Sequence, residues 1–262
     1  MPALGLGTYR MTGGTCQAAV ETALAMGYRH LDTAPMYGNE DAVGAGMAAS
    51  GIARSSIHLT SKVHHALQTP NEIRASFALS LERLRTDYLD LCLVHWPRPG
   101  IDLPAVLTTL MELRASGQAR QIGVANFPVA LLRRALDEVQ APIVCNQIEY
   151  HVLIDQTPVL TFMRERGLTV IAHVPLAQGH LASEPGLDPI ARRHGATVAQ
   201  VALAWLLDQP DVAAVPKAAR SASQRENLDA RRLCLDDSDR AAIAALPKRR
   251  RFVDPPFAPA WD

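Results

Sequence analysis

The chain has 262 residues, 48% of them hydrophobic, and its 26 basic residues balance its 26 acidic ones. This neutral balance disfavours a nucleic-acid partner, because nucleic-acid binders usually carry a basic excess or stripe. No uncharged run approaches the roughly eighteen residues that span a bilayer, and the first residues lack the basic and apolar parts of a secretion signal. The four widely spaced cysteines form no C-x-x-C motif. We therefore expect a cytoplasmic protein that binds a small molecule, with neither nucleic acid nor membrane as a partner.

Short apolar runs alternate with helical patterns along most of the chain, which favours repeated β-α units around a parallel sheet. Strands are predicted near residues 3–7, 28–32, 57–61, 89–94, 120–124, 143–147, 168–172 and 212–215. Helices are predicted at 15–26, 39–49, 70–84, 103–116, 128–138, 155–166, 197–207 and around 221–229. Eight strands with intervening helices in a chain of this length predict an α/β fold, a (β/α)8 TIM barrel that forms a single domain over residues 1–262.

Glycines and polar residues mark the expected ends of several helices. Gly27, Gly117 and Gly167 each follow a helical segment, whereas Thr15 and Asn71 suit a cap or a first turn. The segment 247–262 is rich in proline and arginine and has no periodicity. It is predicted to be a loop that lies over the mouth of the barrel.

Polar residues follow three successive predicted strands. Asp32, Lys62 and His95 each come after an apolar run, and Tyr37 lies five residues beyond Asp32 in the loop that follows. The carboxyl ends of the strands in a parallel barrel meet at one mouth, where active sites of such barrels lie. We therefore expect these four side chains to be neighbours.

The same four residues suit the activation of a carbonyl group. A phenol titrates near pH 10, and we expect the Lys62 ammonium to lower the pKa of Tyr37 so that it can donate a proton. Asp32 would keep that lysine charged and oriented, and His95 would donate a hydrogen bond to the carbonyl oxygen. Since no side chain here supplies an electron pair to carbon, a hydride-carrying cofactor is required.

The cofactor has its own candidate residues. Lys217 follows the eighth predicted strand and precedes a helix, where barrels often bind phosphate. The chain has no G-x-G-x-x-G and no P-loop, so a nucleotide must bind without those cradles. Asn126 and Gln147 could hydrogen-bond an amide such as that of nicotinamide, or could satisfy buried backbone groups.

These motifs together resemble the aldo-keto reductase superfamily along essentially the whole chain. The resemblance rests on DTAPMYGNE (32–40), SK (61–62), HW (95–96), GVANF (123–127), NQIEYH (146–151) and VPK…REN (215–227). Within the family the chain is most similar to compact bacterial diketogluconate and methylglyoxal reductases. The resemblance implies NAD(P)H-dependent reduction of aldehydes and ketones by a monomer, with NADPH as cofactor and NADH as the alternative.

The resemblance also implies roles for individual residues. The catalytic residues would be Asp32, Tyr37, Lys62 and His95, with Tyr37 as the proton donor. The cofactor-binding residues would be Gly7, Thr8, Asn126, Gln147, His173, Pro175, Leu176, Lys217, Arg220, Ser223, Glu226 and Asn227. The substrate pocket would be lined by Tyr9, Met36, His64, Trp96 and the tail around residues 249–261.

The chain departs from the family pattern at four of these places. Ala125 replaces the serine that usually precedes Asn126, and Ala218 replaces the serine after Lys217. Ser223 aligns with the arginine that usually pairs with the 2′-phosphate of NADPH, so that Arg220 or Arg225 would have to substitute. His173 takes the place of the tyrosine or tryptophan that stacks on nicotinamide, and both stacking and buried packing stay open for it.

Two other classes of protein compete with this interpretation. One is a regulatory barrel that holds nucleotide as a redox sensor. The presence of all four residues Asp32, Tyr37, Lys62 and His95 argues against this class. The other is a phosphate-handling isomerase barrel, for which Glu149 is the single candidate carboxylate at a late strand end. The neighbours His64 and His65 are expected to point in different directions, with His65 facing solvent, and no metal site is expected.

Overall fold

The computed structural model describes residues 1–67 and 69–262, and it contains one sheet of eight strands in the order β1 to β8. The strands are β1 (Leu6–Gly7), β2 (His30–Asp32), β3 (His58–Val63), β4 (Leu89–Val94), β5 (Ala119–Ala125), β6 (Ile143–Glu149), β7 (Thr169–His173) and β8 (Val212–Ala214). Every neighbouring pair is parallel. Parallel bridges from Leu4 to Ala214 and from Gly7 to Lys217 close the sheet into a barrel. The predicted TIM barrel is confirmed, and each predicted strand overlaps an observed one.

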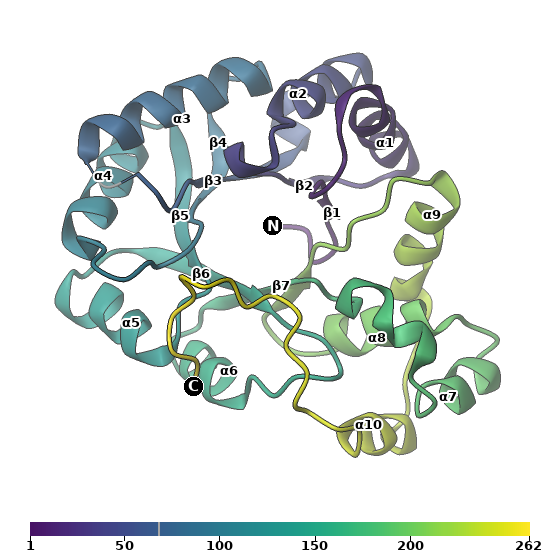
Figure 1. Cartoon of the computed structure of the whole chain (residues 1–262). Coiled ribbons are helices and arrows are strands. Elements are labelled where there is room, and N and C mark those ends of the chain that lie inside the picture. Colours follow the sequence, from purple (N-terminus) through teal and green to yellow (C-terminus); the bar gives the residue numbers. More distant parts are fainter. Residues whose placement is uncertain (68) are drawn as a thin grey trace.

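Helices surround the barrel on all sides (Figure 1). The α-helices are α1 (Gly13–Met26), α2 (Glu40–Ala49), α3 (Pro70–Leu84), α4 (Leu103–Ala115), α5 (Val129–Arg133), α6 (Thr157–Glu165), α7 (Asp188–Arg193), α8 (Val198–Leu207), α9 (Ser221–Asp229) and α10 (Asp237–Ala244). Short helical turns are η1 (Pro35–Tyr37), η2 (Arg54–Ser56), η4 (Ala177–Ser183) and η5 (Ala230–Arg232), and the π-helix η3 (Arg134–Glu138) continues α5. The sequence patterns did not predict α7 and α10, which are short.

Local side-chain chemistry begins and ends several of these helices. Thr69 caps α3 through a reciprocal pair of bonds with Glu72, and Thr197 caps α8 in the same way with Gln200. Gly27 ends α1 with a φ of 106°, a left-handed conformation that costs glycine little. Thr15 lies in the first turn of α1, one of the two positions predicted for it, and the cap position is Thr12.

Apolar side chains fill two layers of the barrel. A large cluster lies between the sheet and its helices, and a small one fills the interior. The interior cluster consists of Leu91, Leu93, Ala125, Cys145, Ile171, Ala213 and Val215. Because both faces of a parallel strand are covered, apolar side chains predominate in β4 and β7, while β3 and β6 carry buried polar side chains toward their carboxyl ends.

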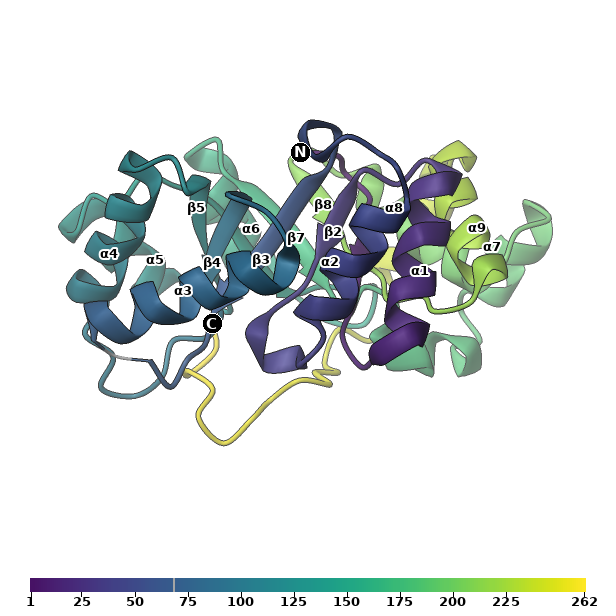
Figure 2. The same cartoon turned by 90° about the horizontal axis from the view of Figure 1, so that it is seen from above.

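The tail from Pro247 to Asp262 crosses one end of the barrel, while the amino terminus lies at the other end (Figure 2). Backbone contacts hold the start of this tail, since Arg249 bridges Ile154 and the Arg250 N–H donates to the Leu153 carbonyl at 3.0 Å. The predicted loop over the mouth is confirmed. In the described ranges no helix combines the length and the apolarity needed to cross a membrane.

Candidate active site

Three strand ends bring the predicted polar residues together. Asp32 ends β2, Lys62 lies one residue before the end of β3, and His95 directly follows β4. Tyr37 reaches the same place from η1, the turn that follows β2. The register pairs β2 with β3 and β3 with β4, so that side chains far apart in the chain lie side by side.

The Lys62 ammonium is the centre of this cluster. Its Nζ lies 2.6 Å from Asp32 Oδ1, 3.0 Å from the Thr33 carbonyl oxygen and 3.4 Å from the Tyr37 hydroxyl. An ammonium has three hydrogens, and each has an oxygen to meet here. The second Asp32 oxygen accepts from Gln147 Nε2 at 2.7 Å. Lys62 is therefore fixed, buried and charged beside the phenol.

The pKa of Tyr37 differs in direction from the sequence-based expectation. Burial raises the pKa of the phenol above 10, and the Lys62 ammonium opposes this shift without reversing it. Burial also acts to lower the pKa of Lys62, but Asp32 and Tyr37 outweigh it, so that the pKa of Lys62 is raised. The sequence-based expectation that Lys62 lowers the pKa of Tyr37 below its ordinary value is therefore wrong for the protein without cofactor. The hydroxyl stays protonated at neutral pH, with a cation positioned to stabilise the anion once the proton leaves.

His95 faces Tyr37 edge to face, with ring centroids 5.7 Å apart. Burial lowers the pKa of His95 well below its ordinary value, so its imidazole is neutral. Its Nδ1 is buried and has no hydrogen-bond partner within the described residues. A neutral imidazole here can donate a hydrogen bond without bringing a second positive charge next to Lys62.

Asn39 holds the loop that carries Tyr37, a role that our sequence analysis missed. Its Nδ2 donates to the carbonyl oxygens of Thr8 and Met11, both at 2.8 Å, and its Oδ1 accepts from Thr33 Oγ1. Thr8 Oγ1 in turn donates to the Asp32 carbonyl. The signal was available, because Asn39 lies in the motif 32–40 beside Tyr37.

Two side-chain amides have free hydrogen-bonding capacity: Asn126 directly follows β5, and Gln147 lies two residues before the end of β6. Asn126 Nδ2 donates to the His95 carbonyl at 3.0 Å, and Asn126 Oδ1 is 2.9 Å from His173 Nε2. One Asn126 N–H and the Gln147 Oε1 have no hydrogen-bond partner in the part of the chain that the structure describes. A donor and an acceptor of this kind match the two halves of a carboxamide.

A close approach of two backbone segments and two exposed cations are found at the end of β8. A Cβ on Gly7 would lie 2.6 Å from the Val215 carbonyl oxygen, so only glycine permits the close approach of β1 to this segment. Lys217 and Arg220 are exposed just before α9, and neither forms an ion pair in the described ranges. Arg220 Nη2 lies 3.4 Å from Ser223 Oγ.

The remaining residues assigned to cofactor binding lie near these ends. Glu226 accepts a hydrogen bond from Thr197, and Asn227 is buried in α9. Pro175 is buried and Leu176 is half-buried in the loop after β7. In that loop Val174, Ala177 and Gln178 have φ values of 51°, 48° and 53°, which non-glycine residues seldom adopt.

Aromatic side chains from the barrel and the tail form the rim. Tyr9 is 49% exposed beside Tyr37 and Met36 is 45% exposed, whereas Trp96 is buried against the tail residues Phe257 and Trp261. The expectation for His65 is wrong: its ring stacks on His64 at 4.4 Å and on Phe257 at 4.1 Å. The tail covers His65 and aligns the two imidazoles.

Glu149 anchors the tail. Its two carboxylate oxygens accept the backbone N–H groups of Phe252 and Val253 at 2.7 and 2.8 Å, and Oε1 also lies 2.9 Å from His151 Nε2. Burial acts to raise the pKa of Glu149, but these bonds outweigh it and hold the pKa below its ordinary value. A carboxylate so occupied is no free base, which disfavours the isomerase alternative.

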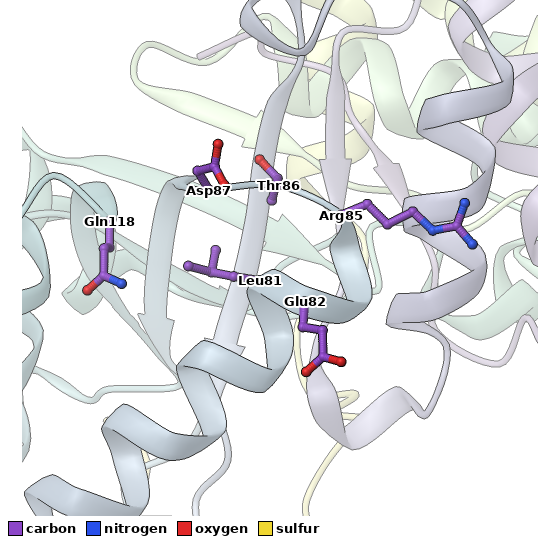
Figure 3. A pocket seen from close by; sticks show the side chains of 6 residues that line it. All are labelled: Leu81, Glu82, Arg85, Thr86, Asp87 and Gln118. Carbon is purple, nitrogen blue, oxygen red and sulfur yellow. The ribbon is translucent and has the colours of Figure 1, made fainter.

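A separate surface depression of about 530 Å³ lies between the end of α3 and the amino ends of β4 and β5 (Figure 3). Its charged side chains Glu82, Arg85 and Asp87 are exposed and point in different directions. Because it lies at the amino ends of these strands, the depression is at the opposite end of the barrel from the cluster around Lys62. In the described ranges no three His, Cys, Asp or Glu side chains are arranged to hold a metal ion.

A closed (β/α)8 barrel with a buried Lys–Asp pair, a phenol and a neutral imidazole at its carboxyl-terminal mouth has its polar cluster at the end where barrel enzymes carry their active sites. The family model described as "Aldo/keto reductase family" matches residues 3–248. The chain belongs to the aldo/keto reductase family. It is thus an oxidoreductase of carbonyl compounds from a family that uses nicotinamide cofactors.

Named relatives cover nearly the whole chain. Methylglyoxal reductase DkgB of Yersinia pestis is 37% identical, covering 100% of this chain and 99% of its own length. Glyoxal reductase of Bacillus subtilis (strain 168) is 38% identical, with coverage of 96% and 91%. Among solved structures, the chain is similar to that of a putative 2,5-diketo-D-gluconic acid reductase B, with 40% sequence identity and a TM-score of 0.97. The match covers 100% of this chain and 94% of the other.

Proposed function

We propose that the protein reduces small aldehydes and ketones to alcohols with NAD(P)H, and that Tyr37 donates the proton. The observation that carries this proposal is the position of Lys62 Nζ, 2.6 Å from Asp32 and 3.4 Å from the Tyr37 hydroxyl. The names of the relatives support methylglyoxal and glyoxal as first substrates for an assay.

Each residue of the cluster has one task in this proposal. The neutral His95 donates a hydrogen bond to the substrate carbonyl oxygen and fixes its direction. Tyr37 transfers its hydroxyl proton to that oxygen as negative charge develops there. Lys62 stabilises the phenolate that remains, and Asp32 keeps the ammonium charged and oriented. The cofactor, when bound, supplies hydride to the carbonyl carbon.

The chain's free polar atoms fit such a cofactor. The spare N–H of Asn126 and the Gln147 Oε1 suit the oxygen and the amino group of a nicotinamide carboxamide. At Gly7 the backbone passes close to Val215, and Lys217 and Arg220 are exposed. These features suit a pyrophosphate or a 2′-phosphate. Thr8, Pro175, Leu176, Ser223, Glu226 and Asn227 complete the proposed cofactor site.

Replacing Tyr37 by Phe tests the assigned acid. We expect Tyr37→Phe to lower kcat for methylglyoxal by at least about a hundredfold, because proton transfer contributes a factor of this order. The dissociation constant of NADPH should change little, since Tyr37 is assigned to the substrate side. Undiminished turnover in this variant would exclude Tyr37 as the proton donor.

A comparison of dissociation constants tests the cofactor preference. We expect tryptophan fluorescence quenching to give tighter binding for NADPH than for NADH, because Lys217 and Arg220 can both meet a 2′-phosphate. Arg220→Gln should reduce the preference, whereas Arg232→Gln, which removes an exposed arginine beyond α9, should not. Equal affinities in the unaltered protein would refute the assigned role of these cations.

We further propose that one domain of residues 1–262 acts as a monomer in the cytoplasm, with residues 247–262 as its substrate loop. Three of the four free cysteines are buried, which suits a reducing compartment. Light scattering after size-exclusion chromatography tests the monomer.

A further inference from the structure

His173 contacts Asn126 at the place where the aromatic residue of the family pattern would stack on nicotinamide. The ring nitrogen Nε2 of His173, at the end of β7, lies 2.9 Å from Asn126 Oδ1. A tyrosine has no ring nitrogen, and the ring nitrogen of a tryptophan belongs to a larger ring of different shape, so this contact is particular to the histidine of this chain. The missing serine before Asn126 has left Ala125, which offers no side-chain hydrogen bond.

The protonation of this pair follows from its partners. The His95 backbone carbonyl can only accept, so the Asn126 atom that meets it at 3.0 Å must be Nδ2. The atom that faces His173 is therefore Oδ1, which also can only accept, and His173 Nε2 must carry the hydrogen. Burial lowers the pKa of His173 to about 4, so the imidazole is neutral at physiological pH. Of the charged groups around it, Glu149 and Asp32 favour protonation, and Lys62 and Arg251 oppose it.

Both partners lie beside strained backbone. Asn126 has a φ of 63°, and Val174, which directly follows His173, has a φ of 51°. A β-branched residue in this conformation is a genuine outlier, and such strain persists only where the surroundings hold it in place. The surrounding barrel therefore holds the backbone in place at both ends of the His173–Asn126 bond.

We propose that His173 is a positioning residue that fixes the Asn126 amide, so that the cofactor carboxamide meets an N–H donor at Asn126 and an acceptor at Gln147. This inference rests on the proposed function and adds the residue that determines how the carboxamide is recognised. Without the His173 N–H, Asn126 Oδ1 would lose its donor and only the His95 carbonyl would hold the amide, so that the remaining N–H would be less well directed at the carboxamide oxygen.

Two substitutions separate this role from simple stacking. His173→Phe keeps an aromatic ring but loses the donor, and His173→Gln loses the ring but keeps an N–H donor. We expect fluorescence quenching to give a dissociation constant for NADPH about tenfold weaker in His173→Phe, the size expected for the loss of one partly buried hydrogen bond. The constant for His173→Gln should stay within about threefold of the unaltered protein. His180→Phe, which keeps a ring against Phe252 and alters an exposed histidine outside the carboxamide contacts, is the matched control, and its dissociation constant for NADPH should equal that of the unaltered protein.

The opposite order, with Phe near the unaltered value and Gln much weaker, would show that the ring stacks and would overturn the proposal. A double-mutant cycle adds a second criterion. If His173 acts through Asn126, His173→Phe should weaken binding no further once Asn126 is replaced by Ala, whereas additive losses would again contradict the proposal.

Nuclear magnetic resonance of the protein without cofactor gives a readout that needs no turnover. We expect nitrogen-15 spectra to place the single ring proton of His173 on Nε2 between pH 6 and 8, and a proton on Nδ1 would refute the assignment. Failure of the unaltered protein to bind NADPH or NADH would instead defeat the proposed function. These spectra would still decide whether His173 orients Asn126.

Discussion

Lys62 depends on neighbours that belong to different segments of the chain. Its ammonium is buried, with Asp32 Oδ1 at 2.6 Å, and Gln147 holds the other Asp32 oxygen. Breaking a buried pair from one side leaves an uncompensated charge, which typically costs about 3–5 kcal/mol. The pair therefore contributes to the stability of the fold as well as to the proposed chemistry, and the two effects need separate tests.

Replacement of both partners can distinguish stability from catalysis. We expect Lys62→Met to lose carbonyl reduction and to lower the free energy of unfolding by about 3 kcal/mol, because Asp32 stays buried without its cation. The double variant Lys62→Met with Asp32→Asn should recover most of that stability and none of the activity. Urea unfolding and steady-state assays measure the two quantities, and a double variant that regained turnover would contradict the role of Lys62.

The tail depends on one buried carboxylate at the end of β6. Both oxygens of Glu149 accept backbone N–H groups from the tail, and Phe252 also stacks on His180 with ring centroids 4.6 Å apart. The rest of the tail reaches the rim, where Phe257 covers His65 and Trp261 meets Trp96. Glu149 therefore determines the shape of the proposed substrate pocket without lining it.

We expect Glu149→Gln to loosen the tail and leave the barrel folded. The amide turns one acceptor into a donor that opposes a backbone N–H, and such a loss costs about 1–3 kcal/mol locally. KM for the carbonyl substrate should rise, and limited proteolysis within 247–262 should accelerate. Glu184→Gln is the control, because its ion pair with Arg250 is long at 4.0 Å and contributes little. Equal proteolysis of the two variants would argue against the anchor.

Two histidines at the amino-terminal end of the barrel, the buried His30 and the half-buried His58, couple the stability of the fold to pH. His30 begins β2 and His58 begins β3, with their rings 4.9 Å apart and edge to face. Burial lowers the pKa of each to about 3 from an ordinary value of 6.5. The unfolded chain therefore binds protons that the folded barrel excludes. The stability associated with these groups is complete above about pH 6.5 and is lost as the pH falls toward 3.

We expect the free energy of unfolding to fall by at least about 2 kcal/mol between pH 7 and pH 5. Guanidinium unfolding at several pH values measures this slope. His58→Phe should flatten it, since one titrating group is removed, while His180→Phe should keep the slope of the unaltered protein. A free energy that is constant over this interval would contradict the neutral state of both histidines in the folded protein.

Local patterns in the sequence predicted the features that depend on neighbours in the chain. The alternation of apolar runs and helical segments identified all eight strands, and β4 and α3 were predicted to the residue. The strand ends placed Asp32, Lys62 and His95 at one mouth, because parallel strands of a barrel must end together. The positions of the proposed catalytic residues therefore followed from topology, which periodicity along the chain encodes.

Only the folded barrel decided the properties that depend on burial and on partners from distant segments. The raised pKa of Tyr37, the stacking of His65 under Phe257 and the anchoring of the tail at Glu149 each need a neighbour more than 20 residues away or the exclusion of water. The bond from His173 to Asn126 spans 47 residues and depends on the curvature of the sheet. Desolvation and hydrogen-bond partners arise only when the barrel closes, so no pattern along the chain could have revealed them.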